Sequence, residues 1–388
     1  MKIAYYNALL NEPWGCGTHG RELVQALRAC GHDVLCIPKP LSQDASSLQP
    51  KAGRYHWVPA PIRKPAMDAR ARLRVMRHRA RMLNALHEFQ PAFVFARRAA
   101  YDYSLDSLLA DAPSPVVAEV NAVLGNELPN LGGETLLPWE TRRERRFLRL
   151  AAACVCISDE VAADVKALGV DPGKIVVLSN GVDTVKFSPS ISPDPSTREL
   201  TGRFSTTIAY AGTLSPVHDM VTLLKAAQEV VRLEPSSGFL FIGVTEDDLL
   251  PYGCSPELAQ HLVCTGRVDH SRVPSMLACA DLSWAAFRSD YVSPLKLFEY
   301  LAMGKPVVIA GTGQARDVTL ASEGGLVVER GDWRGLGAAA VALMRADPAR
   351  RATLGENARA WVQANATWER VAQSIVDEVA ARLSLTER

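Results

Sequence analysis

The sequence predicts an α/β protein with two doubly wound parallel sheets, each forming a Rossmann-like domain. Short apolar runs alternate with longer segments of helical period, which is typical of βα units on a parallel sheet. A stretch rich in proline and serine interrupts this alternation near the middle of the chain, and the alternation then starts again. A length of 388 residues favours two or three domains of ordinary size. We therefore expect two domains of similar architecture.

The first half is expected to hold six strands separated by helices. The strands are predicted near residues 2–8, 33–37, 92–96, 115–120, 154–157 and 175–178, and the helices near 18–30, 67–90, 101–110, 138–151 and 159–168. Cys154 and Cys156 alternate within one apolar run, so we expect both side chains to pack in the core on the same face of a strand. These elements form an expected N-terminal domain over residues 1–187.

The second half repeats the pattern after an expected linker over residues 188–202, in which residues 188–197 include three prolines and four serines. The second domain is expected over residues 203–366, with strands near 206–211, 238–243, 262–265, 282–285, 306–309 and 325–328, and helices near 219–233, 271–280, 294–303 and 333–346. Residues 367–388 are expected to hold a last helix, capped by Thr367, that packs on either domain, the N-terminal one included. Open α/β sheets bind ligands at the carboxyl ends of their strands, so we expect a binding cleft between the domains.

Composition limits the class of protein and its compartment. With 48% hydrophobic and 22% charged residues, the chain is neither disordered nor fibrous. Its 43 basic and 42 acidic residues are unevenly divided, because residues 1–180 carry 23 against 18 and residues 181–388 carry 20 against 24. The sequence lacks an apolar stretch near the ~18 residues of a membrane span, and the apolar core of a signal peptide at its start. Eight cysteines without a C-x-x-C pair favour reduced thiols in a cytoplasm and no metal site.

The basic excess of the first half comes mainly from Arg70–Arg81, which contains six arginines and no acidic residue. On a helix, four of these arginines share one face and apolar side chains share another. Two interpretations stay open: a solvated helix face, or a face that docks on an anionic membrane surface. A second cluster lies between Arg142 and Arg149. Aromatic residues do not alternate with the arginines, so a nucleic-acid partner is not expected.

A glycine-rich motif, G-x-G-x-x-G, spans Gly15–Gly20 after the first predicted strand. Glycine permits a tight turn, and the free N–H groups at the start of the following helix can hold a phosphate. A dinucleotide site also needs an acidic residue at the end of the second strand, but that strand ends in Ile37, Pro38 and Lys39. A dinucleotide-dependent oxidoreductase is therefore an alternative with an incomplete motif, and a glycine turn that binds no ligand is another.

The run Ser293–Ala310, SPLKLFEYLAMGKPVVIA, is the most informative segment. Ser293 is expected to cap a helix, with Pro294 at its first position and Gly304 at its end, before a short buried strand. The start of this helix would then face the cleft.

The first turns of this helix carry groups that suit a nucleoside diphosphate. The free amides of Leu295 and Lys296, the helix dipole and the Lys296 ammonium suit a diphosphate. Glu299 lies about one and a half turns from the cap, near enough to accept hydrogen bonds from two ribose hydroxyls. An ordinary solvated helix charge is the alternative for Glu299.

This run resembles the nucleotide-sugar-binding motif of the family 4 retaining glycosyltransferases, and in particular of the subgroup that carries SPLKLFEY. Other segments resemble the family in the same order along the chain: Gly17 with the helix to His32, Pro115–Asn121, Ser179–Asp183 with Phe187, Tyr210–Ser215 and Thr265–Val268. The resemblance implies the GT-B fold and an EC 2.4 hexosyltransferase that moves a sugar, with retention, from a nucleoside diphosphate such as UDP to a hydroxyl acceptor. The nucleotide-sugar is a substrate, and no metal or other cofactor is expected. The resemblance further implies a role in polysaccharide or glycoconjugate synthesis, with a lipid-linked molecule among the candidate acceptors. The protein would then be cytoplasmic and, with such an acceptor, peripheral on the inner face of the membrane.

The resemblance also assigns roles to residues. On the donor side, Gly17 and Thr18 would close over the diphosphate, and Arg267 and Val268 would lie along the base. The residues expected at the diphosphate and ribose are Ser293, Pro294, Leu295, Lys296 and Glu299. The expected acceptor side comprises His19, Arg97, Glu119 and Asn121, and the expected catalytic groups are Asn121 and Lys296.

Several positions of these expected sites depart from the family pattern. The usual glutamate eight residues before the ribose one is Tyr291, with Asp290 beside it, and the usual arginine and lysine on the diphosphate fall at Thr213 and His218. A histidine common on the acceptor side falls at Asn121. The sugar specificity is therefore open, and a relative that binds a nucleotide-sugar without catalysis is a further alternative. In a retaining reaction the departing phosphate takes the acceptor's proton, so stabilisation of the leaving group matters more than a protein base.

Overall fold

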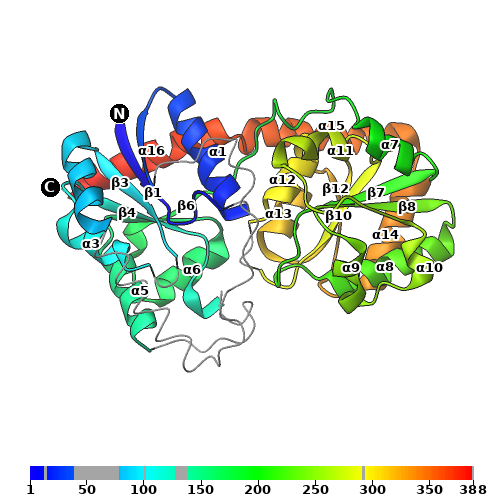
Figure 1. Cartoon of the computed structure of the whole chain (residues 1–388), viewed down its shortest axis with the longest axis horizontal. Helices are drawn as coiled ribbons and strands as arrows, with labels where there is room; N and C mark the ends of the chain where they lie inside the picture. The colour runs from blue at the N-terminus through cyan, green and yellow to red at the C-terminus, as the bar shows by residue number, and fades with distance from the viewer. Residues whose placement is uncertain (13–14, 39–77, 100–101, 127–137, 291–292, 387–388) are drawn as a thin grey trace. The chain divides into compact units, whose positions relative to one another are not determined.

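The computed structural model describes residues 1–12, 15–38, 78–99, 102–126, 138–290 and 293–386. The chain divides into two compact units: the first comprises Met1–Ser179 with Glu369–Arg388, and the second comprises Asn180–Trp368 (Figure 1). Each unit is built on a six-stranded sheet in which all neighbouring strands are parallel. The α/β class with two Rossmann-like parallel sheets is therefore confirmed.

The first sheet has the strand order β2-β1-β3-β4-β5-β6. Its strands are β1 (Lys2–Tyr6), β2 (Asp33–Ile37), β3 (Phe93–Arg97), β4 (Val116–Val120), β5 (Ala153–Cys156) and β6 (Ile175–Val177). The central strands are apolar on both faces, as expected for a parallel sheet covered by helices, and Tyr5 and Phe95 are fully buried there. Cys154 and Cys156 are buried in β5, in agreement with their predicted place in the core.

Helices of the first unit are α1 (Gly15–Ala29), α3 (Ser104–Asp111), α5 (Pro138–Leu150), α6 (Asp159–Ala167), a helix over 78–89 and a 3₁₀ turn at Pro172–Lys174. The C-terminal helix α16 (Trp368–Thr386) packs back on this unit. Arg382 Nη2 on α16 donates to the carbonyl oxygen of Ile175 at 3.3 Å, and Cys30 Sγ lies 3.6 Å from the carbonyl oxygen of Glu369. Residues far apart in the sequence thus complete one unit.

The second sheet has the strand order β12-β11-β10-β7-β8-β9. Its strands are β7 (Thr206–Ala211), β8 (Ser237–Ile242), β9 (Leu262–Cys264), β10 (Leu282–Ala286), β11 (Val307–Ala310) and β12 (Gly325–Val328). The helices are α7 (Pro195–Thr201), α8 (Met220–Leu233), α9 (Glu246–Leu249), α10 (Pro256–Ala259), α11 (Val273–Leu277), α12 (Leu295–Ala302), α13 (Gly313–Ala321), α14 (Trp333–Arg345) and α15 (Pro348–Asn365), with 3₁₀ turns at Leu250–Tyr252 and His270–Arg272. The strand order reverses between β7 and β10, and such a reversal marks the place where doubly wound sheets bind ligands.

The expected linker at 188–202 and the expected boundary at 187 differ from the structure. The contacts divide the chain at Ser179, and residues 188–202 belong to the second unit. They contain α7, whose first turn is capped by Asp194, because Asp194 Oδ1 accepts a hydrogen bond from Thr197 N at 2.9 Å. Proline is common both in linkers and at the first position of a helix, so composition alone does not separate the two.

Several helices of the second unit were not predicted, among them α13 and α15. The buried residues of α15 are Gly355, Ala358 and Val362, of which only one is large. Small buried residues give only a weak apolar periodicity, so the hydrophobic pattern does not indicate a helix here. Gly355 is required by close packing, since a Cβ there would lie 2.1 Å from the carbonyl oxygen of Gly304.

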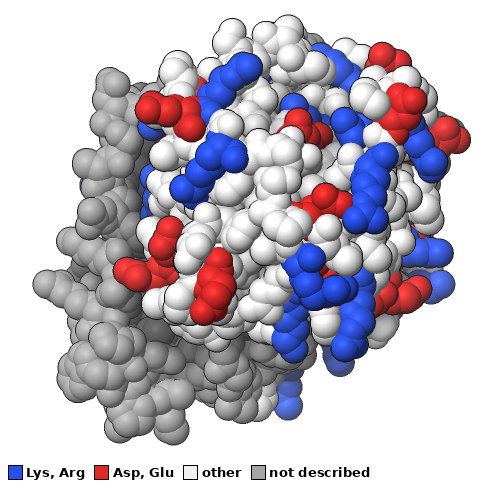
Figure 2. Space-filling model, turned by 90° about the vertical axis from the view of Figure 1, so that its right-hand side faces the viewer, with Lys and Arg blue, Asp and Glu red and all other residues white. Residues whose placement is uncertain are grey.

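The surface of the second unit mixes charges of both signs. Figure 2 shows a face on which lysine and arginine side chains lie among aspartates and glutamates. Ion pairs between partly exposed side chains of this unit include Arg232 with Glu229 and Arg345 with Glu234, each at 2.6 Å. This face therefore carries no broad field of one sign. Within the described part of the chain, no helix is both long enough and apolar enough to cross a membrane.

Candidate functional site

A buried carboxylate, Glu119 on β4, gathers polar side chains at the carboxyl ends of β1, β3 and β4. Its Oε1 lies 2.8 Å from His19 Nε2 and accepts hydrogen bonds from Arg97 Nη1 at 2.9 Å and Asn121 Nδ2 at 3.1 Å. The hydroxyl of Tyr5 donates to Oε2 at 2.8 Å. Burial by itself would raise the pKa of Glu119, but His19 and Arg97 and the hydrogen bonds lower it to about 2. Glu119 is therefore ionised at neutral pH, with donors on both oxygens.

The structure brings together all four residues predicted for the acceptor side: His19, Arg97, Glu119 and Asn121. A carboxylate only accepts hydrogen bonds, so the Nδ2 atom of Asn121 must face Glu119. The Oδ1 atom of Asn121 is buried and has no hydrogen-bond partner among the described residues. An acceptor atom is thus left at the end of β4, in a fixed orientation. Sequence reasoning missed Tyr5, because a tyrosine in an apolar strand has the same pattern as a core residue.

The glycine motif at the start of α1 has a packing explanation. A Cβ on Gly17 would lie 2.0 Å from the carbonyl oxygen of Glu12, and one on Gly20 would lie 2.6 Å from Asn7 Nδ2. Gly17 and Thr18 lie in the first turn of α1, where backbone N–H groups lack partners within the helix. The close approaches account for the two glycines without a dinucleotide, so the motif no longer favours an oxidoreductase.

In the second unit, Lys296 near the start of α12 reaches the loop after β7. Its Nζ lies 3.9 Å from the centre of the Tyr210 ring, and a Cβ on Gly212 would lie only 2.8 Å from Nζ. The side chain is buried, and Nζ has no hydrogen-bond partner among the described residues. Burial lowers the pKa of Lys296 to about 7. A buried ammonium without a partner is costly, and an anion at this place would remove the cost.

The two positions where the family has cations, Thr213 and His218, supply no permanent charge. His218 Nδ1 lies 3.1 Å from the Tyr210 hydroxyl. Burial, and next the nearby Lys296, hold the pKa of His218 well below its usual range, so the ring is neutral at neutral pH. The carbonyl oxygen of Thr213 lies 3.5 Å from the same hydroxyl. Lys296 thus places a cationic group against the loop that holds these two positions.

Glu299 lies on the same helix and is buried, with 9% of its surface exposed. Its Oε1 lies 2.7 Å from His270 Nε2, and His270 Nδ1 lies 3.0 Å from Lys186 Nζ. Among the described residues, His270 is the hydrogen-bond partner of Glu299, and the second carboxylate oxygen has none. Glu299 is therefore not an ordinary solvated helix charge. His270 and Lys186 were missed because neither lies in a motif with Glu299.

The start of α12 differs from the prediction by one residue. Helix α12 begins at Leu295, with Pro294 in extended conformation at the cap position and without a side-chain cap. The Ser293 hydroxyl accepts a hydrogen bond from Asn180 N at 3.3 Å instead, and the Ser293 carbonyl accepts one from Asn180 Nδ2 at 2.7 Å. Ser293 is thus engaged by Asn180 rather than by the start of the helix. Among the described residues, no side chain caps the backbone N–H groups of the first turn.

Asp290, Tyr291, Arg267 and Val268 complete the predicted donor set. The carboxylate of Asp290 is bonded to Arg330 and to the hydroxyl of Thr312. Tyr291 lies outside the described residues. Arg267 is exposed and Val268 half-buried, in the loop after β9.

The loops after β7, β8 and β9 lie side by side, since Gly212 N donates to the Ile242 carbonyl at 2.8 Å and Gly243 N to the Gly266 carbonyl at 3.1 Å. The loop that carries Arg267 therefore lies at the same edge of the sheet as the loop reached by Lys296.

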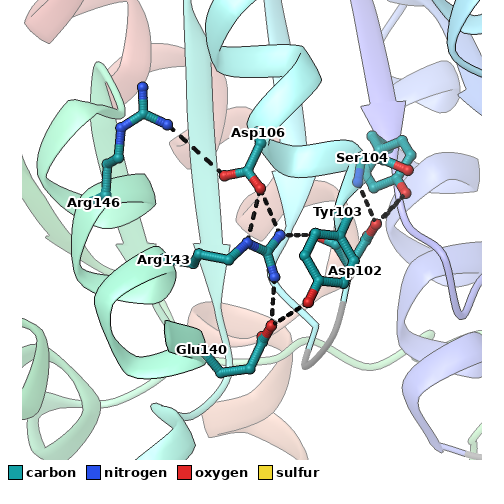
Figure 3. Close-up of polar contacts among 8 residues, drawn as sticks. Asp102, Tyr103, Ser104, Asp106, Glu140, Arg143 and Arg146 are labelled. Atoms are coloured by element: carbon teal, nitrogen blue, oxygen red, sulfur yellow. Dashed lines mark hydrogen bonds and ion pairs between the residues drawn. The ribbon is translucent and has the colours of Figure 1, made fainter. Parts of the chain in front are cut away.

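Part of the predicted second basic cluster is held by acidic residues between α3 and α5 (Figure 3). Arg143 Nε donates to Asp106 at 2.8 Å and Nη1 to Glu140 at 2.7 Å, and its guanidinium lies 3.6 Å from the centre of the Tyr103 ring. Arg146 lies 3.9 Å from Asp106. The exposed arginines of α5 are Arg142, Arg145, Arg146 and Arg149.

Most of the first basic stretch, Arg70 to Arg77, lies outside the described residues. Arg79 and Arg81 are exposed on the helix over 78–89, and Arg79 pairs with Asp111 at 2.5 Å. The choice between a solvated face and a membrane-docking face for this stretch stays a prediction.

Comparison with known proteins gives relatives of one kind. The chain is 32% identical to a GDP-mannose-dependent monoacylated alpha-(1-6)-phosphatidylinositol monomannoside mannosyltransferase of Corynebacterium glutamicum over 201 residues. The matched region covers 50% of this chain and 52% of the relative. The chain is also 32% identical over 175 residues to a putative teichuronic acid biosynthesis glycosyltransferase of Bacillus subtilis, with 42% of each chain covered. The chain thus spans about half the length of the curated relatives it matches.

Solved structures show the same fold at low identity. A sucrose-phosphate synthase from Thermosynechococcus elongatus superposes with a TM-score of 0.72 at 17% identity, over 100% of both chains. The Anabaena protein HepE in complex with UDP-glucose superposes with a TM-score of 0.69 at 16% identity, over 98% of this chain and 100% of that one. The two parallel sheets have the GT-B architecture.

Two family models together match the larger part of each unit. The model described as Glycosyltransferase Family 4 matches residues 15–186, and the model described as Glycosyl transferases group 1 matches residues 205–346. Their order along the chain agrees with the order of the motifs in the sequence. The chain belongs to the family 4 glycosyltransferases.

Proposed function

We propose that the chain is a glycosyltransferase that moves a sugar, with retention, from a nucleoside diphosphate-sugar to a hydroxyl acceptor in glycoconjugate or polysaccharide assembly. The observation that carries the proposal is the buried ammonium of Lys296, which lies without a hydrogen-bond partner among the described residues beside the start of α12. The mannosyltransferase relative is named for GDP-mannose, and HepE was solved with UDP-glucose, so both nucleotides are candidates.

The donor half of the proposed mechanism rests on α12. Lys296 and the uncapped N–H groups of the first turn bind the diphosphate, and the free oxygen of Glu299 accepts hydrogen bonds from the ribose. When the bond between the anomeric carbon and the phosphate oxygen breaks, negative charge develops on the departing diphosphate. An ammonium already placed in a buried site stabilises that charge more strongly than water does. This arrangement supports a reaction without a metal ion.

The acceptor half of the proposal rests on Asn121. In the bound state its Oδ1 accepts a hydrogen bond from the hydroxyl of the acceptor and so orients that hydroxyl, and this hydrogen bond is given up when the proton is transferred. The new carbon–oxygen bond forms as the old one breaks, and the proton of the hydroxyl passes to the departing phosphate oxygen. Glu119 takes no proton in this scheme, because donors occupy both of its oxygens and its pKa is about 2.

Donor binding and turnover test this function directly. UDP-glucose, UDP-galactose and GDP-mannose are screened by thermal shift and calorimetry, and hydrolysis or transfer is followed with and without EDTA. We expect one donor to bind. Lys296→Met and Glu299→Ala should each weaken its binding by about 100-fold, since a hydrogen bond to a charged group contributes up to about 3 kcal/mol. The rate of hydrolysis or transfer should be unchanged by EDTA. Binding without any turnover would favour the non-catalytic alternative, and binding unchanged in both variants would contradict the site.

We further propose that the acceptor is lipid-linked and that the protein works at the cytoplasmic face of a membrane. The mannosyltransferase relative is named for a phosphatidylinositol mannoside, and an Escherichia coli relative, 28% identical over 172 residues, for a diphosphoundecaprenol. Helix α5 supports the proposal, since it exposes Trp139 and Leu150 along with its arginines. Exposed arginines together with exposed apolar side chains suit an anionic lipid surface.

Co-sedimentation with vesicles of phosphatidylglycerol and phosphatidylcholine tests this membrane proposal. The triple variant R142A/R145A/R149A should bind the vesicles about 100-fold more weakly than the unmodified chain, since each of the three arginines contributes about 1 kcal/mol near an anionic surface. The matched control, R232A/R345A, removes two partly exposed arginines of the second unit and should bind as the unmodified chain does. Equal binding by all three proteins would contradict docking through α5.

A further inference from the structure

Three side chains from separate segments of the second unit form a line of polar contacts that ends at Glu299. Lys186 Nζ lies 3.0 Å from His270 Nδ1, and His270 Nε2 lies 2.7 Å from Glu299 Oε1. A lysine ammonium donates hydrogen bonds and accepts none, so His270 Nδ1 must be the acceptor. The ring proton is therefore on Nε2, which donates to the carboxylate. Lys186 thus selects the tautomer of His270 that holds Glu299.

The backbone around Lys186 fixes the outer end of this line. Asp183 Oδ1 accepts hydrogen bonds from the backbone N–H groups of Val185 and Lys186, each at 2.9 Å. The next residue, Phe187, is buried, and its ring centre lies 5.5 Å from that of His270. The Asn-Gly-Val-Asp motif at 180–183 therefore contacts Ser293, just before α12, through Asn180, and it orients the backbone of Lys186 through Asp183.

His270 is held by a short turn of its own. It opens the 3₁₀ turn His270–Arg272, which is capped by Asp269, because Asp269 Oδ1 accepts a hydrogen bond from Ser271 N at 2.8 Å. The imidazole is thus fixed by the turn, by the Phe187 ring and by two polar contacts. A side chain fixed at this many points can hold its hydrogen-bond partner in one orientation.

We propose that His270 is a positioning residue for the nucleoside: it binds Oε1 of Glu299 so that the other oxygen is presented to the ribose hydroxyls, with Lys186 setting the tautomer. The inference rests on the proposed donor site at α12. A glutamate has three rotatable bonds, and binding would otherwise have to fix them. With one oxygen anchored, the plane of the carboxylate is set before the ligand arrives. Glu299 can then discriminate between a ribose and a deoxyribose.

The test compares two replacements of His270 in the full-length protein. His270→Phe keeps the ring and its contact with Phe187 but removes the donor, whereas His270→Gln restores an N–H donor near the position of Nε2. Calorimetry gives the dissociation constants of UDP and GDP and of their 2′-deoxy counterparts. The unmodified chain should prefer one ribonucleotide over its deoxy form. His270→Phe should lose roughly five- to tenfold of that preference, since one hydrogen bond carries it, and His270→Gln should keep it within about twofold.

Two further readouts separate this role from a general structural one. His270→Phe should raise the KM for the donor and leave kcat within about twofold, and ¹⁵N NMR should show an unprotonated Nδ1 in the unmodified chain that gains protonated population in Lys186→Met. A preference for the ribonucleotide that is unchanged in His270→Phe would overturn the positioning role while leaving the donor site intact. An unmodified chain that binds neither UDP nor GDP would instead overturn the donor site, and the inference with it.

Discussion

The two units each contain a buried glutamate within 3 Å of a histidine, but the two carboxylates are partnered differently. Glu119 has partners on both oxygens, supplied by His19, Arg97, Asn121 and Tyr5. Glu299 has His270 on one oxygen and no other hydrogen-bond partner among the described residues. A carboxylate with hydrogen-bond partners on both oxygens orients the side chains around it, whereas a carboxylate with one oxygen free can bind a ligand. The same residue type thus serves the framework in the first unit and, in the donor site that we propose, recognition in the second.

The comparison predicts that the two glutamates differ most in their contribution to stability. Glu119→Gln leaves the buried guanidinium of Arg97 without its counter-charge, so it should lower the free energy of unfolding by about 3–5 kcal/mol. Glu299→Gln keeps an amide that can contact His270 and should change stability by less than about 1 kcal/mol. Urea unfolding of both variants measures the difference. Equal losses in the two variants would mean that the carboxylates do not have the separate roles assigned here.

Acid should destabilise the first unit through protonation of Glu119. The pKa of Glu119 is lowered from 4.5 to about 2, so the folded state binds its proton less readily than the unfolded chain does. The stability from this group is fully present above about pH 4.5 and is lost as the pH falls toward 2, by roughly 3 kcal/mol. Urea unfolding between pH 5 and 2 should show this loss in the unmodified chain, and Glu119→Gln should lack that part of the pH dependence. If the free energy of unfolding fell equally with pH in both proteins, the stabilising role of the Glu119 charge would be contradicted.

Much of the fold could be predicted because buried parallel strands are short apolar runs, and strands such as Asp33–Ile37 and Thr206–Ala211 begin and end where the sequence placed them. Helix α15 could not, because its core contacts come from small residues. In the site, Lys296 and Glu299 could be predicted because they belong to one helix with recognisable end signals. His270 was not, since it lies 29 residues from Glu299 and their contact depends on how loops meet at the sheet edge.

A third prediction concerns the charge beside Glu299. The pKa of Lys296 is lowered to about 7 by burial, so the ammonium that we propose to bind the diphosphate is depleted as the pH rises. The affinity for UDP or GDP should fall above pH 7 by up to tenfold per pH unit, the limit for loss of one proton. Calorimetry from pH 6.5 to 9 measures it, because a terminal phosphate is already ionised above a pKa near 6. Lys296→Arg is the matched control: an arginine stays charged, so its profile should be flat if it still binds.

The smallest expected effect tests whether Glu119 serves the reaction by orienting Asn121. Asn121→Ala removes the oriented Oδ1 and should lower kcat about tenfold, typical of one lost hydrogen bond to a reacting group, while the Kd for the donor stays within about twofold. Asn121→Asp tests the orientation itself, because a second carboxylate 3.1 Å from Glu119 repels it and cannot donate to it. That variant should lose more activity than Asn121→Ala even though it keeps an acceptor oxygen. If Asn121→Asp were as active as the unmodified chain, the amide donor to Glu119 would be dispensable, and the carboxylate of the first unit would have no part in placing the acceptor.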